Sequence, residues 1–220
     1  VYKNVYAFIT PSEFLKNKLA LNGFEEKRIH CIPTFTASKT TIGEQQIGSY
    51  GLYFGRVTEE KGVETVIKAY EKLPEYTVKI MGDDTTDEAK RLKKYVENHK
   101  MKNVEFLGFK SGEELENVIK GARFTLIPSI WYDNLPNTAL ESFQYSKPVI
   151  ASNIGSLPEL VIDGENGYLF KPSNVEDLIK KIKMLDDDTL VKKMGQASRK
   201  RLESRFAPQT HYEELMKIFN

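Results

Sequence analysis

The sequence contains little of what disulfide-bonded, metal-binding or membrane-spanning proteins need. Cys31 is the 1 cysteine of the 220 residues, and it cannot form a disulfide within the chain. This favours a reducing compartment such as the cytoplasm. The 3 histidines are not spaced as metal ligands, and a structural or surface role is expected for each. No apolar run approaches the roughly 20 residues that span a bilayer, and no signal peptide is apparent.

An excess of charge of one sign is also absent. The chain has 32 Lys and Arg against 31 Asp and Glu, a formal net charge of +1, so nucleic acid is not expected as a partner. With 40% hydrophobic and 29% charged residues, the composition is that of an ordinary globular protein. The length suffices for one large α/β domain. The chain opens without Met on an apolar segment, and we expect that an upstream part was removed.

Short apolar segments alternate with amphipathic ones along the chain. The predicted strands are 5–9, 28–32, 50–54, 76–81, 104–107, 124–127 and 148–151. Helical spacing groups apolar residues into three faces: Val63, Val66, Ile67, Tyr70 and Leu73; Leu115, Val118, Ile119 and Ala122; and Val175, Leu178, Ile179, Ile182 and Leu185. This alternation predicts an α/β fold, a parallel sheet with helices on both faces.

Two segments interrupt the alternation. Residues 34–49 are polar and read as a loop, and residues 153–167 are predicted to be a structured loop because they contain several glycines and a proline. After Asp188 the chain is helical and strongly charged, and 206–220 is expected to be a separate helix. Ligands of open parallel sheets bind at the carboxyl ends of the strands. The candidate site residues should therefore follow directly after the predicted strands.

The segment GRVTEEKG, residues 55–62, follows one of these strands and opens a predicted helix over 61–73. Gly55 leaves room for a ligand to approach the backbone. Arg56 carries a planar fork suited to phosphate. Lys61 would lie in the first helical turn, where a cation opposes the helix dipole unless a polyanion binds there. Without further information, Arg56 and Lys61 could equally well be solvated surface charges that bind no ligand.

A second segment, residues 131–152, follows the predicted strand 124–127. Asn134 can cap a helix, and Pro136 is tolerated in a first turn. A helix start at the end of a parallel strand is an anion site. Asp133 and Glu141 carry carboxylates suited to sugar or ribose hydroxyls. Without further information, a capping role for Asp133 and a solvated helix position for Glu141 are the simpler interpretation.

Together these segments resemble the carboxy-terminal domain of retaining glycosyltransferases of the GT-B architecture, specifically glycosyltransferase family four. FITPSEFLKNKL (8–19) is similar to the opening strand and helix of that domain. VEFLGFKSGEEL (104–115) is similar to its segment near the base, and IASNIGSLPELVIDGENGYLF (150–170) to the loop after its paired carboxylates. The order and spacing of the pieces cover nearly the whole chain. The resemblance implies a Rossmann-like domain over 1–205 that forms one half of a GT-B fold.

The resemblance also implies roles for individual residues. Arg56 and Lys61 would hold the diphosphate of a nucleotide-sugar donor, and Asp133 would contact the transferred sugar. The other residues implied to bind the donor are Gly55, Phe109, Lys110, Asn134, Leu135, Pro136, Asn137, Thr138 and Glu141. Among these, Glu141 would bind the ribose, and Phe109 and Lys110 would lie near the base. The backbone N–H groups around Leu135, Asn137 and Thr138 would meet sugar and phosphate oxygens.

Two positions depart from the family pattern. Asp133 stands where the family usually has Glu, so the carboxylate reaches less far by one methylene group. Pro136 stands where Gly is frequent, and one backbone donor is lost there because proline has no N–H.

The implied reaction is transfer of a sugar from a nucleoside diphosphate to an acceptor, with retention and without a metal or other cofactor. The acceptor, such as a sugar, a lipid-linked sugar or a polysaccharide, would bind to an amino-terminal domain that this sequence lacks. Residues 206–220 would pack on that domain. A location at the inner face of the membrane, through peripheral association of the full-length enzyme, is a further expectation by analogy.

Other interpretations remain open at the level of sequence. A nucleotide-sugar epimerase or a phosphorylase of related fold, or a non-catalytic nucleotide-binding α/β module, would share much of the pattern. A dinucleotide-binding module would need G-x-G-x-x-G after an early strand, and the sequence has none.

Several conspicuous side chains are expected to be structural. Asp83, Asp84 and Asp87 follow a predicted strand in a Thr-rich turn, where backbone capping is more usual than a metal site. Trp131 could stack on a sugar, but packing is the favoured role. The residues predicted to be in the core are Cys31, Phe143, Tyr145 and Phe170.

Overall fold

The protein is a parallel α/β structure with a small additional β-unit at its amino-terminal end. The computed structural model describes residues 2, 4–36 and 46–219. The strands are β1 (Phe8–Thr10), β2 (Ile29–Cys31), β3 (Tyr50–Phe54), β4 (Thr77–Met81), β5 (Val104–Gly108), β6 (Ala122–Ile127), β7 (Val149–Ser152) and β8 (Gly167–Phe170). The helices are α1 (Glu13–Leu21), α2 (Val63–Glu71), α3 (Asp87–Asn98), α4 (Gly112–Lys120), α5 (Asn137–Gln144), α6 (Leu157–Leu160), α7 (Val175–Met184), α8 (Asp188–Arg205) and α9 (Pro208–Phe219), with 3-10 turns at Glu26–Arg28 and Glu59–Lys61.

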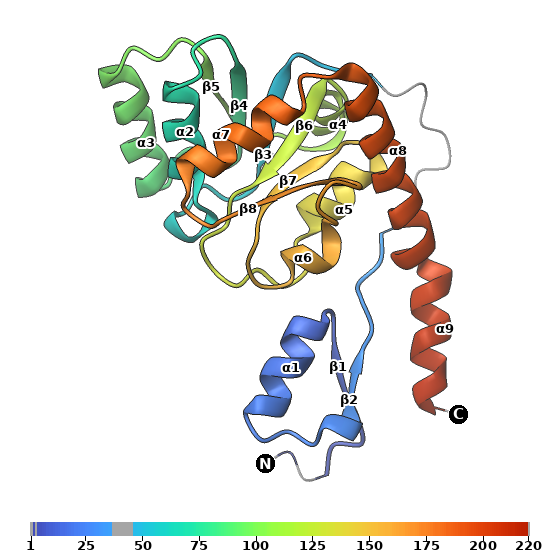
Figure 1. Ribbon diagram of the computed structural model, residues 1–220. Coiled ribbons are helices and arrows are strands. Elements are labelled where there is room, and N and C mark those ends of the chain that lie inside the picture. Colours follow the sequence, from blue (N-terminus) through green and yellow to red (C-terminus); the bar gives the residue numbers. More distant parts are fainter. Residues whose placement is uncertain (1, 3, 37–45, 220) are drawn as a thin grey trace.

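Six strands form the main sheet in the order β5-β4-β3-β6-β7-β8, and every pair is parallel. Helices cover both faces of this sheet (Figure 1). The chain order reverses beside β3, where β4 lies on one side and β6 on the other. Such a switch point opens a crevice at the carboxyl ends of the strands. The predicted α/β fold with helices on both faces is confirmed.

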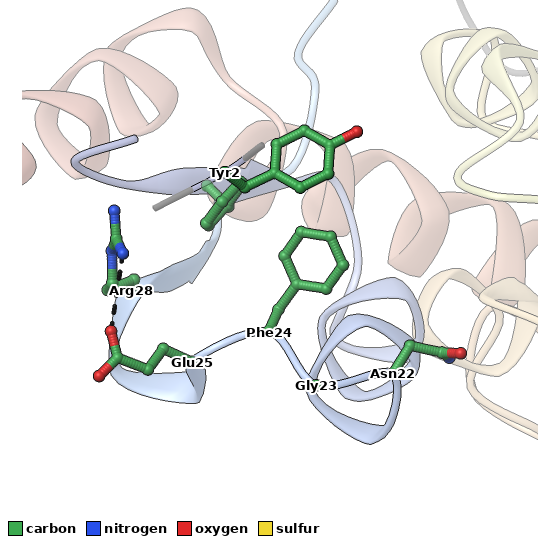
Figure 2. A pocket seen from close by; sticks show the side chains of 7 residues that line it. Tyr2, Asn22, Gly23, Phe24, Glu25 and Arg28 are labelled. Carbon is green, nitrogen blue, oxygen red and sulfur yellow. Dashed lines mark ion pairs between the residues drawn. The ribbon is translucent and has the colours of Figure 1, made fainter. Parts of the chain in front are cut away.

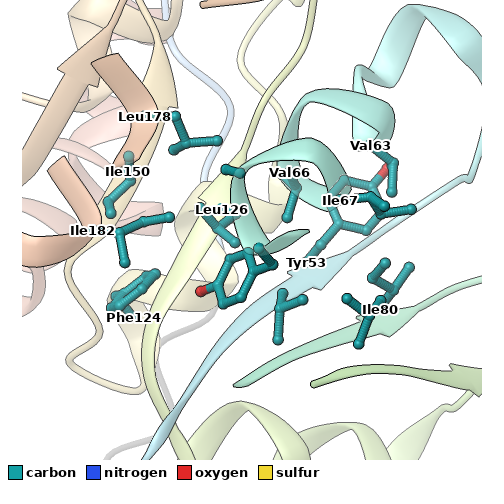
Figure 3. Close-up of a cluster of buried hydrophobic side chains, with 14 of the residues drawn as sticks. Tyr53, Val63, Val66, Ile67, Ile80, Phe124, Leu126, Ile150, Leu178 and Ile182 are labelled. Atoms are coloured by element: carbon teal, nitrogen blue, oxygen red, sulfur yellow. The ribbon is translucent and has the colours of Figure 1, made fainter. Parts of the chain in front are cut away.

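The core lies on both sides of the sheet because each strand alternates its side chains. On β3, Tyr53 packs into the larger apolar cluster, whereas Leu52 and Phe54 pack into a cluster on the other face. Val66 and Ile67 of α2 lie over the larger cluster, opposite Leu126 of β6 (Figure 3). α7 covers the neighbouring part of the same face through its apolar residues.

The predicted helical faces are largely confirmed. Val63, Val66, Ile67, Tyr70 and Leu73 are all buried. Ala122 was grouped with the second face but begins β6. Phe143, Tyr145 and Phe170 are core residues as predicted, and Cys31 is half-buried in β2.

Three elements of the main domain have no counterpart among the predicted strands and helices, namely α3, β8 and the short helix α6, which lies within the predicted loop 153–167. Helix α3 is strongly charged and buries only Ala89, Leu92 and Val96, so its apolar stripe is narrow. Strand β8 follows the loop after β7 and pairs with β7 at the edge of the sheet. The aspartate turn before α3 matches its prediction, because Asp83 accepts a hydrogen bond from the backbone N–H of Thr85 at 2.9 Å.

The first two predicted strands do not join the main sheet. β1 and β2 pair with each other in a separate two-stranded parallel sheet. Figure 1 shows β1, α1 and β2 beside α9, apart from the six-stranded sheet. A strand pattern predicts an extended segment but does not say which neighbour it pairs with. The predicted loop at 34–49 falls partly on residues 37–45, which lie outside the described residues.

Candidate functional site

Two adjoining cavities lie at the carboxyl ends of the central strands. One, of about 340 Å³, is lined by Lys61 and Asp133, and the other, of about 310 Å³, by Phe109 and Glu141. We call them the Lys61 cavity and the Glu141 cavity. Both cavities are lined by Phe54, Gly55, Arg56 and Thr138. Two segments far apart in the sequence, the one after β3 and the one between β6 and α5, thus form one continuous site.

The floor of the site depends on close contact between two backbones. Gly55 directly follows β3 with a φ of +143°, a conformation that residues with side chains rarely adopt, and its N–H donates to the Met81 carbonyl at 3.0 Å. A Cβ on Gly82 would lie 1.9 Å from the carbonyl oxygen of Gly55. Only glycine therefore allows the end of β4 to pack against Gly55. The sequence interpretation included Gly55 but missed Gly82.

Lys61 and Asp133 form an ion pair within the Lys61 cavity. The Lys61 Nζ atom lies 2.5 Å from Asp133 Oδ1, and the two side chains are only 19% and 16% exposed. The second oxygen of Asp133 accepts a hydrogen bond from the Ser129 hydroxyl. The sequence predicted Lys61 in the first turn of a helix. In the structure it is instead the last residue of the 3-10 turn that precedes α2.

Gly62 fixes the backbone beside this ion pair. Its φ is +67°, and a Cβ there would lie 2.1 Å from the carbonyl oxygen of Pro128. The segment after β3 and the segment after β6 therefore touch through their backbones at this point. Since Lys61 precedes Gly62 and Ser129 follows Pro128, the contact brings the amine and its carboxylate partner together.

Arg56 extends from the end of β3 between the two cavities. Its side chain is exposed, and its guanidinium group makes no ion pair with the residues that the structure describes. Its backbone carbonyl is held by the hydroxyl of Tyr53. Burial is the first cause that raises the pKa of that hydroxyl, so Tyr53 remains a neutral donor.

Helix α5 begins at the Lys61 cavity, and Pro136, Asn137 and Thr138 line that cavity. The N-cap position is occupied by Pro136 and not by Asn134, and no side chain caps the helix. The first backbone N–H groups of a helix have no partner within it and carry partial positive charge. The helix start therefore adds positive potential to the wall that carries Lys61.

Two groups near this helix start that were expected to serve the donor already have partners within the chain. The N–H of Leu135 donates to the hydroxyl of Ser156 at 2.7 Å, and Leu135 is buried, so this donor is not available to a ligand. The side chain of Asn134 accepts a hydrogen bond from the Ser12 hydroxyl at 2.6 Å. Neither residue lines the two cavities. Long-range contacts that the sequence does not reveal have engaged both groups.

The backbone of the loop that carries Asp133 is held by hydrogen bonds from Ser156. The carbonyl oxygen of Asp133 accepts hydrogen bonds from the N–H and the hydroxyl of Ser156, at 3.1 Å and 2.9 Å. A Cβ on Gly155 would lie 2.8 Å from the same carbonyl oxygen. The Asp133 side chain therefore faces the cavity from a fixed backbone. Gly155 and Ser156 are positioning residues that the sequence interpretation placed in a loop without assigning them a role.

The Glu141 cavity has an apolar lining with a carboxylate in it. Glu141 lies in α5, half-buried, and its carboxylate makes no hydrogen bond with any described residue. Burial raises the pKa of this carboxyl group. Glu141 is thus not the solvated helix residue of the simpler interpretation. An unpartnered carboxylate beside an apolar wall can accept hydrogen bonds from a ligand that carries two hydroxyl groups.

Phe109 and Lys110 lie at the rim of the Glu141 cavity. Phe109 is 74% exposed, so its ring is free to stack on a planar ligand. Lys110 forms an exposed ion pair with Glu114 at 3.4 Å. Trp131, for which packing was the favoured role, is 68% exposed, and that prediction is wrong.

A third cavity, of about 350 Å³, lies on the β1–α1–β2 unit and not at the main sheet. Its walls carry the aromatic rings of Tyr2, Phe8 and Phe24 together with the Arg28–Glu25 ion pair (Figure 2). None of the site residues predicted from the sequence lies there. Within the described ranges, no group of His, Cys, Asp or Glu side chains could hold a metal ion. None of the described helices is long and apolar enough to cross a membrane.

Comparison with known proteins assigns the chain to a family. Residues 41–201 match the model of the family glycosyl transferases group 1. The chain is 30% identical to an uncharacterised glycosyltransferase of Methanocaldococcus jannaschii over 190 residues, which are 86% of this chain and 52% of that protein. It is 31% identical to the glycogen synthase of Mycobacterium tuberculosis over 186 residues, 80% of this chain and 42% of the synthase. The chain therefore belongs to the glycosyl transferases group 1.

Solved structures share the fold. A glycosyltransferase from Rickettsia africae has a TM-score of 0.88 at 21% identity, with 99% of this chain and 65% of that chain covered. HepE of Anabaena, solved in complex with UDP and glucose, has a TM-score of 0.86 at 19% identity, with 97% of this chain and 62% of that chain covered. The chain thus has the fold of one part of a GT-B glycosyltransferase. The chain spans about half the length of the curated relatives it matches.

Proposed function

We propose that the chain is the donor-binding half of a retaining glycosyltransferase and that it binds a nucleoside-diphosphate sugar. The observation that carries the proposal is that Arg56, Lys61 and the start of α5 line one cavity. A diphosphate is the ligand that two cations and a helix start favour together. HepE of Anabaena, whose fold is similar, was solved with UDP and glucose, which supports this ligand class.

The mechanism places positive potential where the leaving group gains charge. As the bond from the sugar to the diphosphate breaks, negative charge grows on the phosphate oxygens and positive charge on the sugar ring. Arg56, Lys61 and the N–H groups of Asn137 and Thr138 would stabilise the diphosphate. Each preorganised donor of this kind is commonly worth about 2.7–4 kcal/mol in the transition state. With these groups, the reaction would need no metal ion.

The rest of the donor would extend from the Lys61 cavity into the Glu141 cavity. Glu141 would accept hydrogen bonds from the ribose hydroxyls, and Phe109 with Lys110 would lie against the base. Asp133, on the opposite side of Arg56, would contact the transferred sugar. The shared lining of the two cavities supports one ligand that spans both.

The acceptor would bind to the part of the protein that lies outside this chain, and α9 would pack on that part. We propose that the isolated chain binds the donor without sustained turnover, and that the complete enzyme works in the cytoplasm, with peripheral membrane association as an extension by analogy. Sustained sugar transfer by the 220-residue chain alone would contradict this proposal. No observation favours the epimerase, the phosphorylase or the non-catalytic module over the transferase.

The proposed function is tested by ligand binding to the chain. A thermal-shift screen against UDP, GDP, ADP and their sugars should identify the base, because a ligand of the folded state raises the apparent stability. Calorimetry of Lys61→Ala should then show a larger loss of affinity for the nucleoside diphosphate than for the nucleoside. Lys68→Ala is the matched control, since Lys68 pairs with Glu64 on α2 and lies outside both cavities. Equal losses for both ligands in Lys61→Ala would show that Lys61 does not contact phosphate.

A further inference from the structure

In the structure, the two cations of the Lys61 cavity differ in their partners. Lys61 is neutralised by Asp133 at 2.5 Å. Arg56 is exposed and has no ion-pair partner within the described ranges. An anion that enters the cavity therefore meets Arg56 without an ion-pair partner among the described residues, and Lys61 already paired with a carboxylate.

The carboxylate cannot move far from Lys61. Its backbone is held by Ser156, and its second oxygen by the Ser129 hydroxyl. The backbone of Lys61 is held through the contact of Gly62 with Pro128. A diphosphate that reaches Lys61 must then share it with Asp133 or displace Asp133, and in both cases a second negative charge remains nearby, which disfavours binding.

A nucleotide sugar changes this balance, because its sugar hydroxyls can donate hydrogen bonds to the carboxylate. A free nucleoside diphosphate brings no such donor and leaves the carboxylate with Ser129 alone. A partly buried carboxylate that loses its cation without new donors is costly. The same side chain therefore favours the ligand with a sugar and disfavours the ligand without one.

From this we propose that Asp133 is a specificity-determining residue that makes the site discriminate against diphosphates without a sugar. This inference rests on the proposed function and deepens it. After the sugar is transferred, its hydroxyls no longer donate to Asp133, while the carboxylate still repels the remaining nucleoside diphosphate, so the ion pair with Lys61 re-forms and the product leaves. The competition between a carboxylate and a phosphate for one amine would thus favour release of the product.

The test uses the 220-residue chain and inorganic pyrophosphate as a probe that does not depend on the base. Asp133→Asn retains a polar group of similar size beside Ser129 but removes the charge. We expect it to bind pyrophosphate at least about fivefold more tightly than the wild type by calorimetry, a gain of about 1 kcal/mol. The ratio of affinities for the nucleotide sugar and its nucleoside diphosphate should fall by a similar factor.

Glu60→Gln is the matched control for net charge. Glu60 precedes Lys61 in the same turn and interacts electrostatically with Arg56 and Lys61, but its carboxylate accepts a hydrogen bond from Thr58 and forms no ion pair with either cation. If Glu60→Gln tightens pyrophosphate binding as much as Asp133→Asn, the effect is one of general charge and the inference is wrong. Asp133→Glu keeps the charge and should keep the preference for the nucleotide sugar.

A double-mutant cycle identifies the cation involved. In a Lys61→Ala background, Asp133→Asn should tighten pyrophosphate binding much less, because the amine for which the carboxylate competes is gone. A full effect in that background would overturn the role of the ion pair. Thermal unfolding of each variant verifies that it is folded, and Asp133→Ser, which also removes the charge, replaces Asp133→Asn if that variant is not.

The outcomes separate the inference from the function on which it rests. If the wild type binds the nucleotide sugar and Lys61→Ala weakens it, but Asp133→Asn leaves pyrophosphate binding unchanged, the inference fails and the proposed function stands. If the wild type binds neither pyrophosphate nor any nucleotide sugar, both fail.

Discussion

The contact between Gly62 and Pro128 gives a sharp test of how the fold forms the site. Gly62→Ala introduces one methyl group at a position where φ is +67°. The ideal Cβ would lie 2.1 Å from the Pro128 carbonyl oxygen and 3.1 Å from a side-chain carbon of Ile130. The nearest atom belongs to the backbone, so rotation of a side chain cannot relieve the overlap.

Two costs add up at this position. A residue other than glycine in the left-handed region costs roughly 1–2 kcal/mol. Overpacking against a fixed neighbour costs typically about 1–3 kcal/mol more. We therefore expect Gly62→Ala to lower the free energy of unfolding by about 2–5 kcal/mol. Gly164→Ala separates the two costs, because Gly164 has a φ of +81° with nothing within 4 Å of its Cβ. It should show the conformational cost alone.

Urea denaturation of both variants measures the difference, and calorimetry with pyrophosphate tests its functional consequence. Gly62→Ala should also weaken pyrophosphate binding, because the strain shifts the backbone next to Lys61, whereas Gly164→Ala should leave binding unchanged. Equal losses of stability in the two variants would refute the proposed steric contact. Normal binding by a strongly destabilised Gly62→Ala would refute its role in placing Lys61.

Two further predictions concern ionisable groups that are buried or half-buried. Lys147 is buried and donates to the backbone carbonyls of residues 46, 120 and 122 at 2.6–2.7 Å. Lys147→Met should therefore lower the free energy of unfolding, measured by urea denaturation, by roughly 1–3 kcal/mol. An unchanged free energy of unfolding would contradict a structural role for Lys147. Burial raises the pKa of Glu141 in the folded chain. Between the ordinary and the raised pKa, the folded chain therefore binds more protons than the unfolded chain, and its stability falls as the pH rises through that window. Glu141→Gln should therefore stabilise the empty chain at pH 7, with a gain that shrinks at roughly pH 4, and a gain independent of pH would contradict this.

Much of the fold could be predicted from the sequence because periodicity reports on local structure. The spacing of Val63, Val66 and Ile67 predicts both the existence of α2 and its buried face. The same reasoning fails for α3, whose charged sequence leaves a narrow apolar stripe, and for the pairing of β1 with β2. Which strand neighbours which is a long-range property that the pattern does not contain.

For the candidate site, the sequence by itself determined the residue types and their positions after strands: a segment at 55–62 that carries Arg56 and Lys61, and a helix start near Asp133. Only the tertiary structure decided their partners. Lys61 and Asp133 are 72 residues apart and meet through the contact of Gly62 with Pro128. The N–H of Leu135 is engaged by a serine 21 residues away. The physical reason is that hydrogen bonds and ion pairs act only at contact distance, and contact between distant segments arises from the packing of the whole chain.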